Sequence, residues 1–433
     1  MKRPLTYLTG LVAFIFAASL ANGQTTFTWT GHGANNEWFN GANWDVSSAP
    51  NNVETANAVF GESGHAHIQL WSDPYDYSVD VYGLTIAGNT HPYYFDGDYD
   101  GNITMTIGAG GITYSPAQPV RSVIEADIEL YDDQTWNIAN GTLVIDGEMY
   151  DGDSNFTFTK TGAGTLVFGD YDNEFDYSII NLNNGRLALS PINGSGYRPL
   201  GYADLVIGPA TGGNNPIIVA RNTNYSGWVE LDNEITLNGA LTTENYRELY
   251  LKGEVIMNSD STIRSRGMPL FIEDSIIDGP SGTPAPRKLI VDSSNIVVLT
   301  GNNAYTGGTH VINGVLIFGG ALSIPSNYHE SSSVGHLSSG PNGYIGFADN
   351  GYTGSVQHYF INDFDKANTH GTIGFDSDPE ASINTFTGNI DLSSAPTGTA
   401  FASDAKLGSA TEAILSGTIT PQGTTYRFGG GGG

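Results

Sequence analysis

The sequence predicts an all-β protein built of many short strands, and it favours a parallel β-helix over an antiparallel β-sandwich or a propeller. Glycine supplies 57 of the 433 residues, a level that opposes helix interiors. Runs rich in Val, Ile, Thr, Leu and Phe recur every ~8–15 residues, and most are bounded by Gly, Asn or Asp, which tolerate tight turns. The clearest runs are residues 26–29, 103–107, 142–145, 165–168, 186–189, 296–299 and 315–318.

Asn-Gly pairs recur beside these runs, at residues 140–141, 184–185 and 313–314. In a hairpin protein such a pair makes a two-residue turn between antiparallel strands. In a β-helix the same pair turns a corner between two strands of one coil, because Asn and Gly accept a positive φ. The irregular spacing of the pairs fits corners with variable loops better than a regular meander. An antiparallel sandwich or propeller stays open at this stage.

Residues 1–23 predict a secretory signal peptide. Two basic residues start the segment, residues 11–20 form a short apolar run, and small residues follow. The run is shorter than the ~20 residues that a membrane-spanning helix needs. We expect cleavage after Gly23, with Ala21 as the alternative, and no later segment able to span a membrane. The absence of cysteine then fits an exported bacterial protein better than a disulfide-stapled domain.

Residues 24–61 form a tryptophan-rich segment that we expect to close the first coil. Trp29, Trp38 and Trp44 lie within 16 residues of one another. The open end of a strand stack would otherwise expose unpaired strand edges and apolar rows. The three rings therefore predict a small aromatic core at the N-terminal end.

Residues 62–325 contain the internal repetition that supports a solenoid. One unit begins with FTKTGAGTLVF at residues 158–168 and continues to NGRLAL at 184–189. A second unit runs from NIVVLTGNNAYTGGT at 295–309 to NGVLIF at 313–318. Both units share the order strand, Gly, polar turn with an aromatic residue, strand, Asn-Gly, strand. Because one unit cannot bury its apolar face alone, we expect the units to stack.

The two units resemble the autotransporter-associated β-strand repeat, also called the passenger-associated transport repeat. Residues 158–168 are similar to its LxKxGxGTLxL pattern, and residues 299–316 to its LxGxNxYxGGTxVxxGxL continuation. The first unit lacks the Gly-Gly-Thr and the second lacks the Lys-x-Gly-x-Gly, so that each is complete where the other departs. The resemblance implies a right-handed parallel β-helix carried as a passenger of an exported protein, and it implies no catalytic residues.

Residues 326–433 continue the β texture without the repeat pattern. The sequence ends in a run of glycines, as if in mid-architecture. No alternating strands of a membrane barrel follow, so we do not expect this chain to transport itself. Residues 402–414 are the one helix-like stretch, and Gly408 interrupts it.

The strongest metal candidate is the loop DGDYDGN at residues 96–102. Alternate oxygen ligands can converge on one hard cation, and Gly permits the sharp turn. The Glu expected at the twelfth position is Ile107. Weak Ca²⁺ binding and an acidic, solvated loop tip are the two interpretations, and no other cofactor is expected. The candidate ligands are Asp96, Asp98, Asp100 and Asn102.

Weaker candidates follow the same logic. Asp151, Asp153 and Asn155 repeat the alternation without the Gly, and His65 and His67 share one strand face but have no evident third ligand. Aromatic rings gathered in a polar stretch suit contact with sugar rings or stacking on one another. These are Tyr75, Tyr77, Tyr93, Tyr94, Phe95 and Tyr99.

Polysaccharide cleavage is the enzymatic alternative. A hydrolase needs two positioned carboxylates, and a lyase needs a basic proton acceptor. Acidic residues are so numerous that no pair stands out, and we expect the arginines to face outward and offset some of the acids. The candidates are Asp363 with Asp365, Asp376 with Asp378, Arg264 with Arg266, and Arg287 with Lys288.

The charge balance narrows the function. With 16 basic against 45 acidic residues the chain carries a formal charge of −29, which excludes a nucleic-acid binder. We predict a non-catalytic structural or adhesive passenger-type protein, exported to the surface or surroundings of a Gram-negative-type bacterium. Its loops would meet a cell-surface partner or an extracellular polysaccharide. The alternatives are a polysaccharide-active β-helix lyase or hydrolase and a secreted carbohydrate-binding protein.

Overall fold

The computed structural model of the chain describes most of its length. The described residues are 23–62, 66–71, 78–97, 103–170, 172–190, 198–208, 216–221, 227–279, 285–325, 335–348, 359–377, 383–393 and 400–429. The predicted signal peptide therefore lies, apart from Gly23, outside the described residues, and it stays a prediction.

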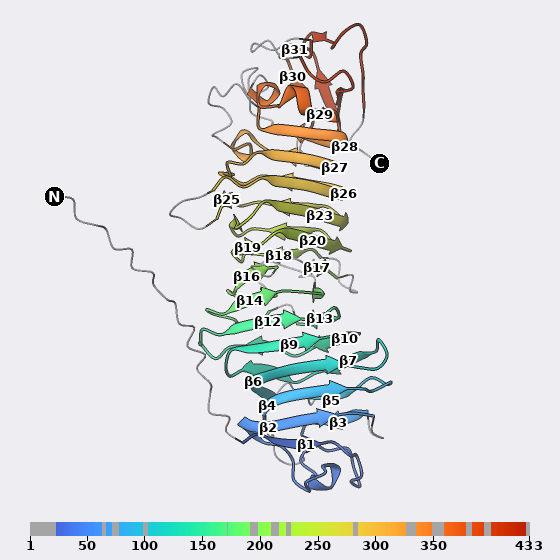
Figure 1. Cartoon of the computed structure of the whole chain (residues 1–433), viewed down its shortest axis with the longest axis vertical. Coiled ribbons are helices and arrows are strands. Elements are labelled where there is room, and N and C mark those ends of the chain that lie inside the picture. Colours follow the sequence, from blue (N-terminus) through green and yellow to red (C-terminus); the bar gives the residue numbers. More distant parts are fainter. Residues whose placement is uncertain are drawn as a thin grey trace, which may run out of the picture.

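The chain folds as a parallel β-solenoid of about 12 turns, in which the strands lie across the long axis and stack along it (Figure 1). Successive turns are joined by parallel ladders, such as Phe158 opposite Ile180 and Leu289 opposite Thr309. Parallel pairing confirms the solenoid and disagrees with the sandwich or propeller alternative, since those folds need antiparallel neighbours. The right-handed course that the resemblance implies stays a prediction.

Each turn has up to three sides, which the chain visits in a fixed order. The first side stacks β1 (Thr25–Thr28), β2 (Asn52–Phe60), β4 (Val79–Ala87), β6 (Thr104–Ser115), β9 (Gln134–Ile138), β12 (Thr157–Thr161), β14 (Ile179–Leu182), β16 (Asp204–Ile207), β19 (Ile235–Leu237), β22 (Val255–Met257) and β25 (Ile276–Asp278). The second side stacks β3 (His67–Gln69), β5 (Tyr94–Asp96), β7 (Arg121–Ile124), β10 (Thr142–Ile145), β13 (Thr165–Phe168), β15 (Arg186–Leu189), β17 (Ile217–Ala220), β20 (Ala240–Asn245), β23 (Ser261–Gly267) and the first half of β26 (Leu289–Leu299).

The third side holds shorter stretches. It contains β8 (Asp127–Leu130), β11 (Met149–Tyr150), β18 (Val229–Leu231), β21 (Leu249–Leu251), β24 (Leu270–Ile272) and the second half of β26. Towards the C-terminal end the long strands stack in the order β26, β27 (Thr309–Phe318), β28 (Leu337–Phe347), β29 (Thr372–Phe375) and β32 (Lys406–Gly408). Two small pairs follow, β30 (Asn384–Phe386) with β33 (Ala413–Leu415) and β31 (Ile390–Asp391) with β34 (Ile419–Thr420).

The Asn-Gly pairs turn corners between parallel strands, as predicted. Gly141, Gly185 and Gly314 all have a positive φ, of 66°, 72° and 86°. The side chains of Asn140 and Asn184 accept the N–H of the following glycine at 2.8 Å. The pair therefore fixes the direction of the next strand within one coil.

One apolar core runs through the solenoid from Trp29 to Leu407. Alternate residues of each strand point inward, as in β9, where Gln134, Trp136 and Ile138 are buried between half-exposed or exposed neighbours. Each buried Leu, Ile or Val contributes about 1.5–3 kcal/mol. This core is continuous across residues 61–62, and the predicted segment boundaries stay a prediction.

The three tryptophans of the N-terminal segment pack together as expected. Trp29, Trp38 and Trp44 are all at most 2% exposed. Their rings lie 4.9–5.7 Å from one another or from the ring of Phe60. This aromatic group fills the first turns of the stack.

The helix expected at residues 402–414 is wrong, because these residues form β32 and β33. Gly408 lies against the carbonyl of Gly429, where a Cβ atom would have no room. The glycine therefore serves a close approach of two backbones, which a helical interpretation of the sequence misses.

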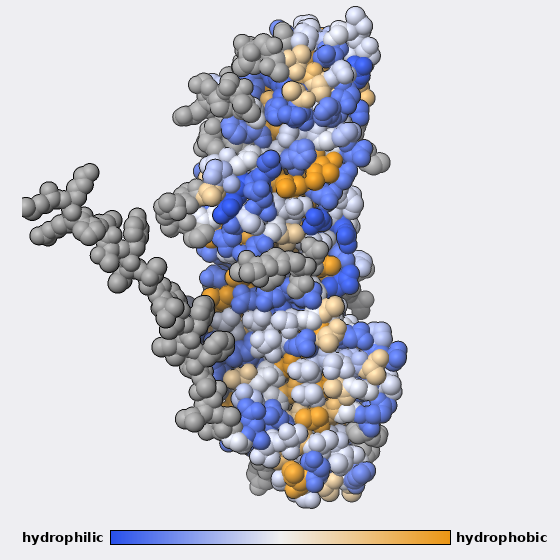
Figure 2. Space-filling model, viewed as in Figure 1, coloured by the Kyte–Doolittle hydropathy of each residue, from blue (hydrophilic) through white to orange (hydrophobic). Residues whose placement is uncertain are grey.

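The outer surface is mostly hydrophilic. On the face shown in Figure 2, apolar groups form small separate patches between polar ones. Half-buried rings on the outside stack on their neighbours in the next turn, as Tyr250 does with Phe271 at 4.6 Å between ring centroids. Such stacking uses the ring faces that a sugar would need.

Candidate functional site: repeat corners and a lateral groove

Buried asparagines join consecutive turns at the corners that the repeat pattern marks. In the second repeat the Asn303 carbonyl accepts the N–H of Ile276 at 2.8 Å, and its amide donates to the carbonyl of Ser323 at 2.6 Å. In the first repeat Asn173 does the same with the N–H of Met149, at 2.8 Å, and the carbonyl of Pro199, at 2.9 Å. Each side chain therefore binds the turn before and the turn after its own.

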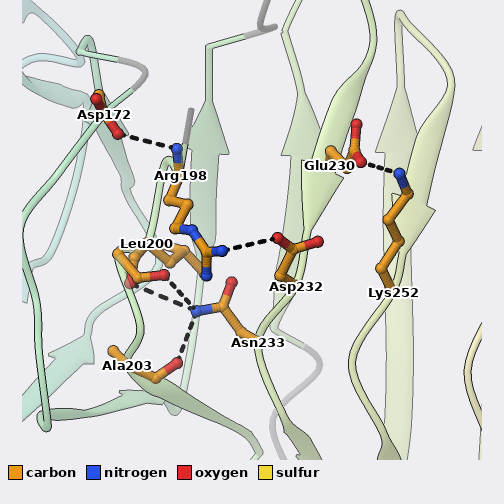
Figure 3. A network of polar contacts seen from close by, with 9 residues as sticks. Asp172, Arg198, Leu200, Ala203, Glu230, Asp232, Asn233 and Lys252 are labelled. Carbon is orange, nitrogen blue, oxygen red and sulfur yellow. Dashed lines mark hydrogen bonds and ion pairs between the residues drawn. The ribbon is translucent and has the colours of Figure 1, made fainter. Parts of the chain in front are cut away.

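A third asparagine, outside both repeats, has a related role (Figure 3). The amide of Asn233 donates to the carbonyls of Ala203 at 2.8 Å and Gly201 at 3.1 Å. On the outside, Arg198 Nη2 lies 3.5 Å from the carboxylate of Asp232, and Lys252 pairs with Glu230. Amides thus join the turns inside the corner, and ion pairs join them at the surface, where each pair contributes little.

Lys160 is the most unusual residue of the first repeat. Its side chain is fully buried, and Nζ donates to the carbonyls of Thr161, Gly162 and Asn184 at 2.9–3.0 Å. The first two carbonyls belong to its own turn and the third belongs to the next turn. Burial lowers the pKa of Lys160 to about 8. The lysine of the repeat pattern is therefore a corner clamp inside the solenoid and not a surface charge.

The two repeats lie on different sides of the solenoid. The first copy opens with β12. This strand lies on the side of the solenoid that continues with β14, β16, β19, β22 and β25. The second copy opens with β26, whose first half stacks through β23, β20, β17 and β15 onto β13. Since β13 is the second strand of the first copy, the pattern has advanced by one side of the coil between the two.

Two of the arginine candidates, Arg264 and Arg266, lie on the outside and pair with acids. Within β23, Ile263 and Ser265 are buried while Arg264 and Arg266 face outward, as the alternation predicts. Arg264 lies 3.6 Å from Asp292, and Arg266 lies 3.6 Å from Glu244. In these ion pairs the arginines offset acidic charges along the rod. The same guanidinium groups would have to serve as the base of a lyase.

The acidic candidates are in structural contacts as well. Asp365 caps the short 3-10 helix η4 (Lys366–Asn368), and its carboxylate accepts from Asn368. Burial raises the pKa of Asp363 to about 7. Asp376 is fully buried and accepts from Tyr344 Oη at 2.6 Å and from the N–H groups of Ala410 and Thr411 at 2.7 and 3.0 Å. Asp378 lies outside the described residues.

The Ca²⁺ candidate is only partly described. Asp98, Asp100 and Asn102 lie outside the described residues, while Asp96 ends β5 and its carboxylate lies 3.2 Å from Nε2 of His67. His65 is also outside the described residues. Within the described ranges no group of three or more His, Cys, Asp or Glu residues is arranged to hold a metal ion. The Ca²⁺ site stays a prediction.

The other candidates from the sequence have structural roles. The carboxylate of Asp151 accepts from Ser178 Oγ at 2.7 Å and from the N–H of Asp176 at 3.1 Å, which links two turns. Tyr93 and Phe95 are fully buried in the core, so an aromatic surface patch that includes them is wrong. Tyr75, Tyr77 and Tyr99 lie outside the described residues.

A groove that the sequence did not indicate runs along the C-terminal half of the rod. It has a volume of about 470 Å³ and crosses β26, β27, β28, β29 and β32 in turn. Its polar lining includes Ser294, Asn295, Asn342, Tyr344, Thr372 and Lys406. A second hollow, of about 430 Å³, lies on β4, β6, β8 and β11, and its lining contains Asp80 and Glu129. The two surfaces differ in charge.

We expect the replacement of Asn303 by alanine to lower the unfolding free energy by about 2 kcal/mol, because the N–H of Ile276 and the carbonyl of Ser323 lose their buried partner. The urea unfolding curve, followed by circular dichroism, measures the change. Asn342→Ala is the matched control, since Asn342 is exposed and makes one long hydrogen bond, of 3.3 Å. Equal shifts for the two variants would contradict the clamp role of Asn303.

Among the described residues, none of the helices has the length and apolar character needed to cross a membrane. This finding concerns helices alone.

Comparison with known proteins agrees with the repeat pattern. The model of the passenger-associated-transport repeat matches residues 158–189 and 289–318, which are the two units whose asparagines form the corner clamps. No curated protein and no solved structure matches the chain. The chain therefore carries two passenger-associated-transport repeats, set on different sides of one parallel β-solenoid.

Proposed function

We propose that this protein is a non-catalytic, exported passenger-type protein that acts as a rigid rod at the cell surface or in the surroundings of the cell. The observation that carries the proposal is the role of the repeat residues. Lys160, Asn173 and Asn303 all bind backbone groups of neighbouring turns. A pattern used in this way maintains a long, continuous stack. Its presence in two copies supports a structural role, with function carried by the outer surface.

The non-catalytic part of the proposal is supported by the contacts of the candidate acids and bases. Asp376 accepts hydrogen bonds from four residues, and Arg264 and Arg266 pair with acids on the outside. Export is supported by the signal-like sequence at residues 1–23 and by the family of the repeats.

Export has a direct test. We expect the full chain, produced in a Gram-negative host, to leave the cytoplasm and to begin at Gln24 after processing, as measured by cell fractionation and N-terminal sequencing. A variant with Phe14→Asp and Ile15→Asp should stay inside and keep its N-terminus, because charge breaks the apolar run. An unprocessed wild-type chain in the cytoplasm would refute export. Both substitutions lie outside the residues that form the solenoid, and circular dichroism of the two proteins checks that the fold is the same.

A further inference from the structure

We propose that the groove crossing β26 to β32 binds a linear, negatively charged polysaccharide chain along the rod axis. This inference concerns the ligand of one surface and is independent of the export route. The groove volume of about 470 Å³ lies within the range of ligand sites. Parallel strands lie ~4.8 Å apart, so a groove that crosses five consecutive strands extends for about 19 Å. An elongated, extended ligand fits this shape.

The charge of the groove favours an anion. The chain has 45 acidic and 16 basic residues, yet the described residues that line the groove include Lys406 and no acid. The carboxylate of the neighbouring Asp404 is hydrogen-bonded to Nδ1 of His370, at 2.8 Å. This hydrogen bond is the main cause of the lowered pKa of Asp404. Asp376, close by, is buried under Tyr344 and Thr411. The charge of Lys406 also contributes to the lowered pKa of Asp404, so this carboxylate lies near the groove. Among the described residues that line the groove itself, Lys406 is the one charged side chain.

The remaining lining suits hydroxyl groups. Asn342 donates its amide to Asn313 at 3.3 Å, and Asn313 donates to the carboxylate of Asp292 at 2.8 Å, so that a ladder of side chains joins three turns beside the groove. This ladder leaves the Asn342 carbonyl as an acceptor, and Thr372 adds a hydroxyl deeper in the groove. Gly314 and Gly343 also line the groove, and the space of their missing side chains is taken by the backbone of the preceding turn, at Ser293 and Val311. The amides of Asn295 and Asn342 and the hydroxyl of Thr372, which come from three different strands, can bind the hydroxyl groups of a polysaccharide along the groove.

The second hollow gives the opposite picture and serves as a comparison. Its lining contains Asp80, Glu129, Tyr131 and Tyr150 without any basic residue. An anionic chain would be repelled there. The two hollows therefore favour ligands of different charge, and the preference for an anion belongs to the groove alone.

The test is calorimetric titration of the full processed chain with two probes at low salt, a hexamer of galacturonate and the neutral hexamer maltohexaose. We expect the anionic hexamer to bind, with an affinity that falls as salt is added, and the neutral hexamer to bind at least tenfold more weakly. Lys406→Gln should weaken the anionic hexamer about tenfold and leave the neutral one unchanged. Asn342→Ala should weaken both by a few fold.

Lys288→Gln is the matched control, since it removes one positive charge from an exposed position outside the groove lining. Its titration should match that of the wild type. Equal affinity for the two hexamers, no binding of the anionic hexamer, or an equal loss in Lys406→Gln and Lys288→Gln would each overturn the proposal. Circular dichroism checks that each variant keeps the solenoid, and Asn342→Ala provides a second test if Lys406→Gln fails to fold.

Discussion

Replacing Lys160 by methionine is expected to lower the unfolding free energy by about 3 kcal/mol at pH 7. Methionine keeps most of the volume, but the carbonyls of Thr161, Gly162 and Asn184 lose the donor that all three share. Removing one partner from a buried charged network typically costs about 3–5 kcal/mol. The midpoint of the urea transition measures the change, and Lys252→Met is the control, because the Lys252 ammonium is partly exposed and pairs with Glu230 at the surface.

The difference in stability between the wild type and Lys160→Met is expected to depend on pH. Burial lowers the pKa of Lys160 to about 8, whereas an unfolded lysine has the ordinary value of 10.5. Between pH 8 and 10.5 the unfolded chain therefore holds a proton that the folded chain has released, and rising pH favours the folded state by about 1.4 kcal/mol per unit. The wild type should gain stability over Lys160→Met as the pH rises through this range. A constant difference would show that Lys160 does not titrate in the fold.

The second large effect is expected at Asp376. Asp376→Leu should destabilise the C-terminal turns by about 4 kcal/mol, because Tyr344 Oη and the N–H groups of Ala410 and Thr411 lose a buried acceptor. Burial, followed by the charge of Asp376 and the hydrogen bond to it, raises the pKa of Tyr344, so the phenol stays a donor. Hydrogen exchange should show early opening of residues 409–411.

Asp404→Asn is the control for this experiment. Asp404 is exposed and contacts His370 at the surface, so its replacement should change the stability by less than about 1 kcal/mol. If Asp376→Leu opens residues 409–411 no more than Asp404→Asn does, the carboxylate does not hold this segment on the stack.

The strand pattern was readable from the sequence because apolar alternation and turn residues are local signals. The runs at 142–145, 165–168 and 186–189 coincide with β10, β13 and β15. Residues 296–299 and 315–318 are the second halves of the longer strands β26 and β27. The first halves of these strands, residues 289–291 and 309–311, were not expected from the sequence. Polar residues at a corner separate each of them from the apolar run that follows.

The corner clamps could be located but not explained from the sequence. Lys160, Asn173 and Asn303 were visible as members of a pattern, yet their partners in other turns lie 20 or more residues away. A single polar residue in a sequence does not tell whether it faces water or the interior. The repeated placement of Asn two residues before a buried aromatic, Phe175 or Tyr305, is the signal that could have pointed inward.

The groove was beyond the sequence for a different reason. Its lining comes from five strands between residues 293 and 429, and no two of the key residues, Asn342, Thr372 and Lys406, are close along the chain. Surface shape and local charge depend on how turns of unequal length stack. The formal charge of −29 describes the whole chain and does not reveal that Lys406 is the one charged residue among the described residues that line the groove.

The advance of the repeat by one side of the coil distributes the two copies over different sides of the rod. The polar turn of the first copy follows β13, and that of the second follows the second half of β26, so the two equivalent turns leave the rod at different angles. The two copies therefore hold different sides of the rod together, and no single side of the rod carries both.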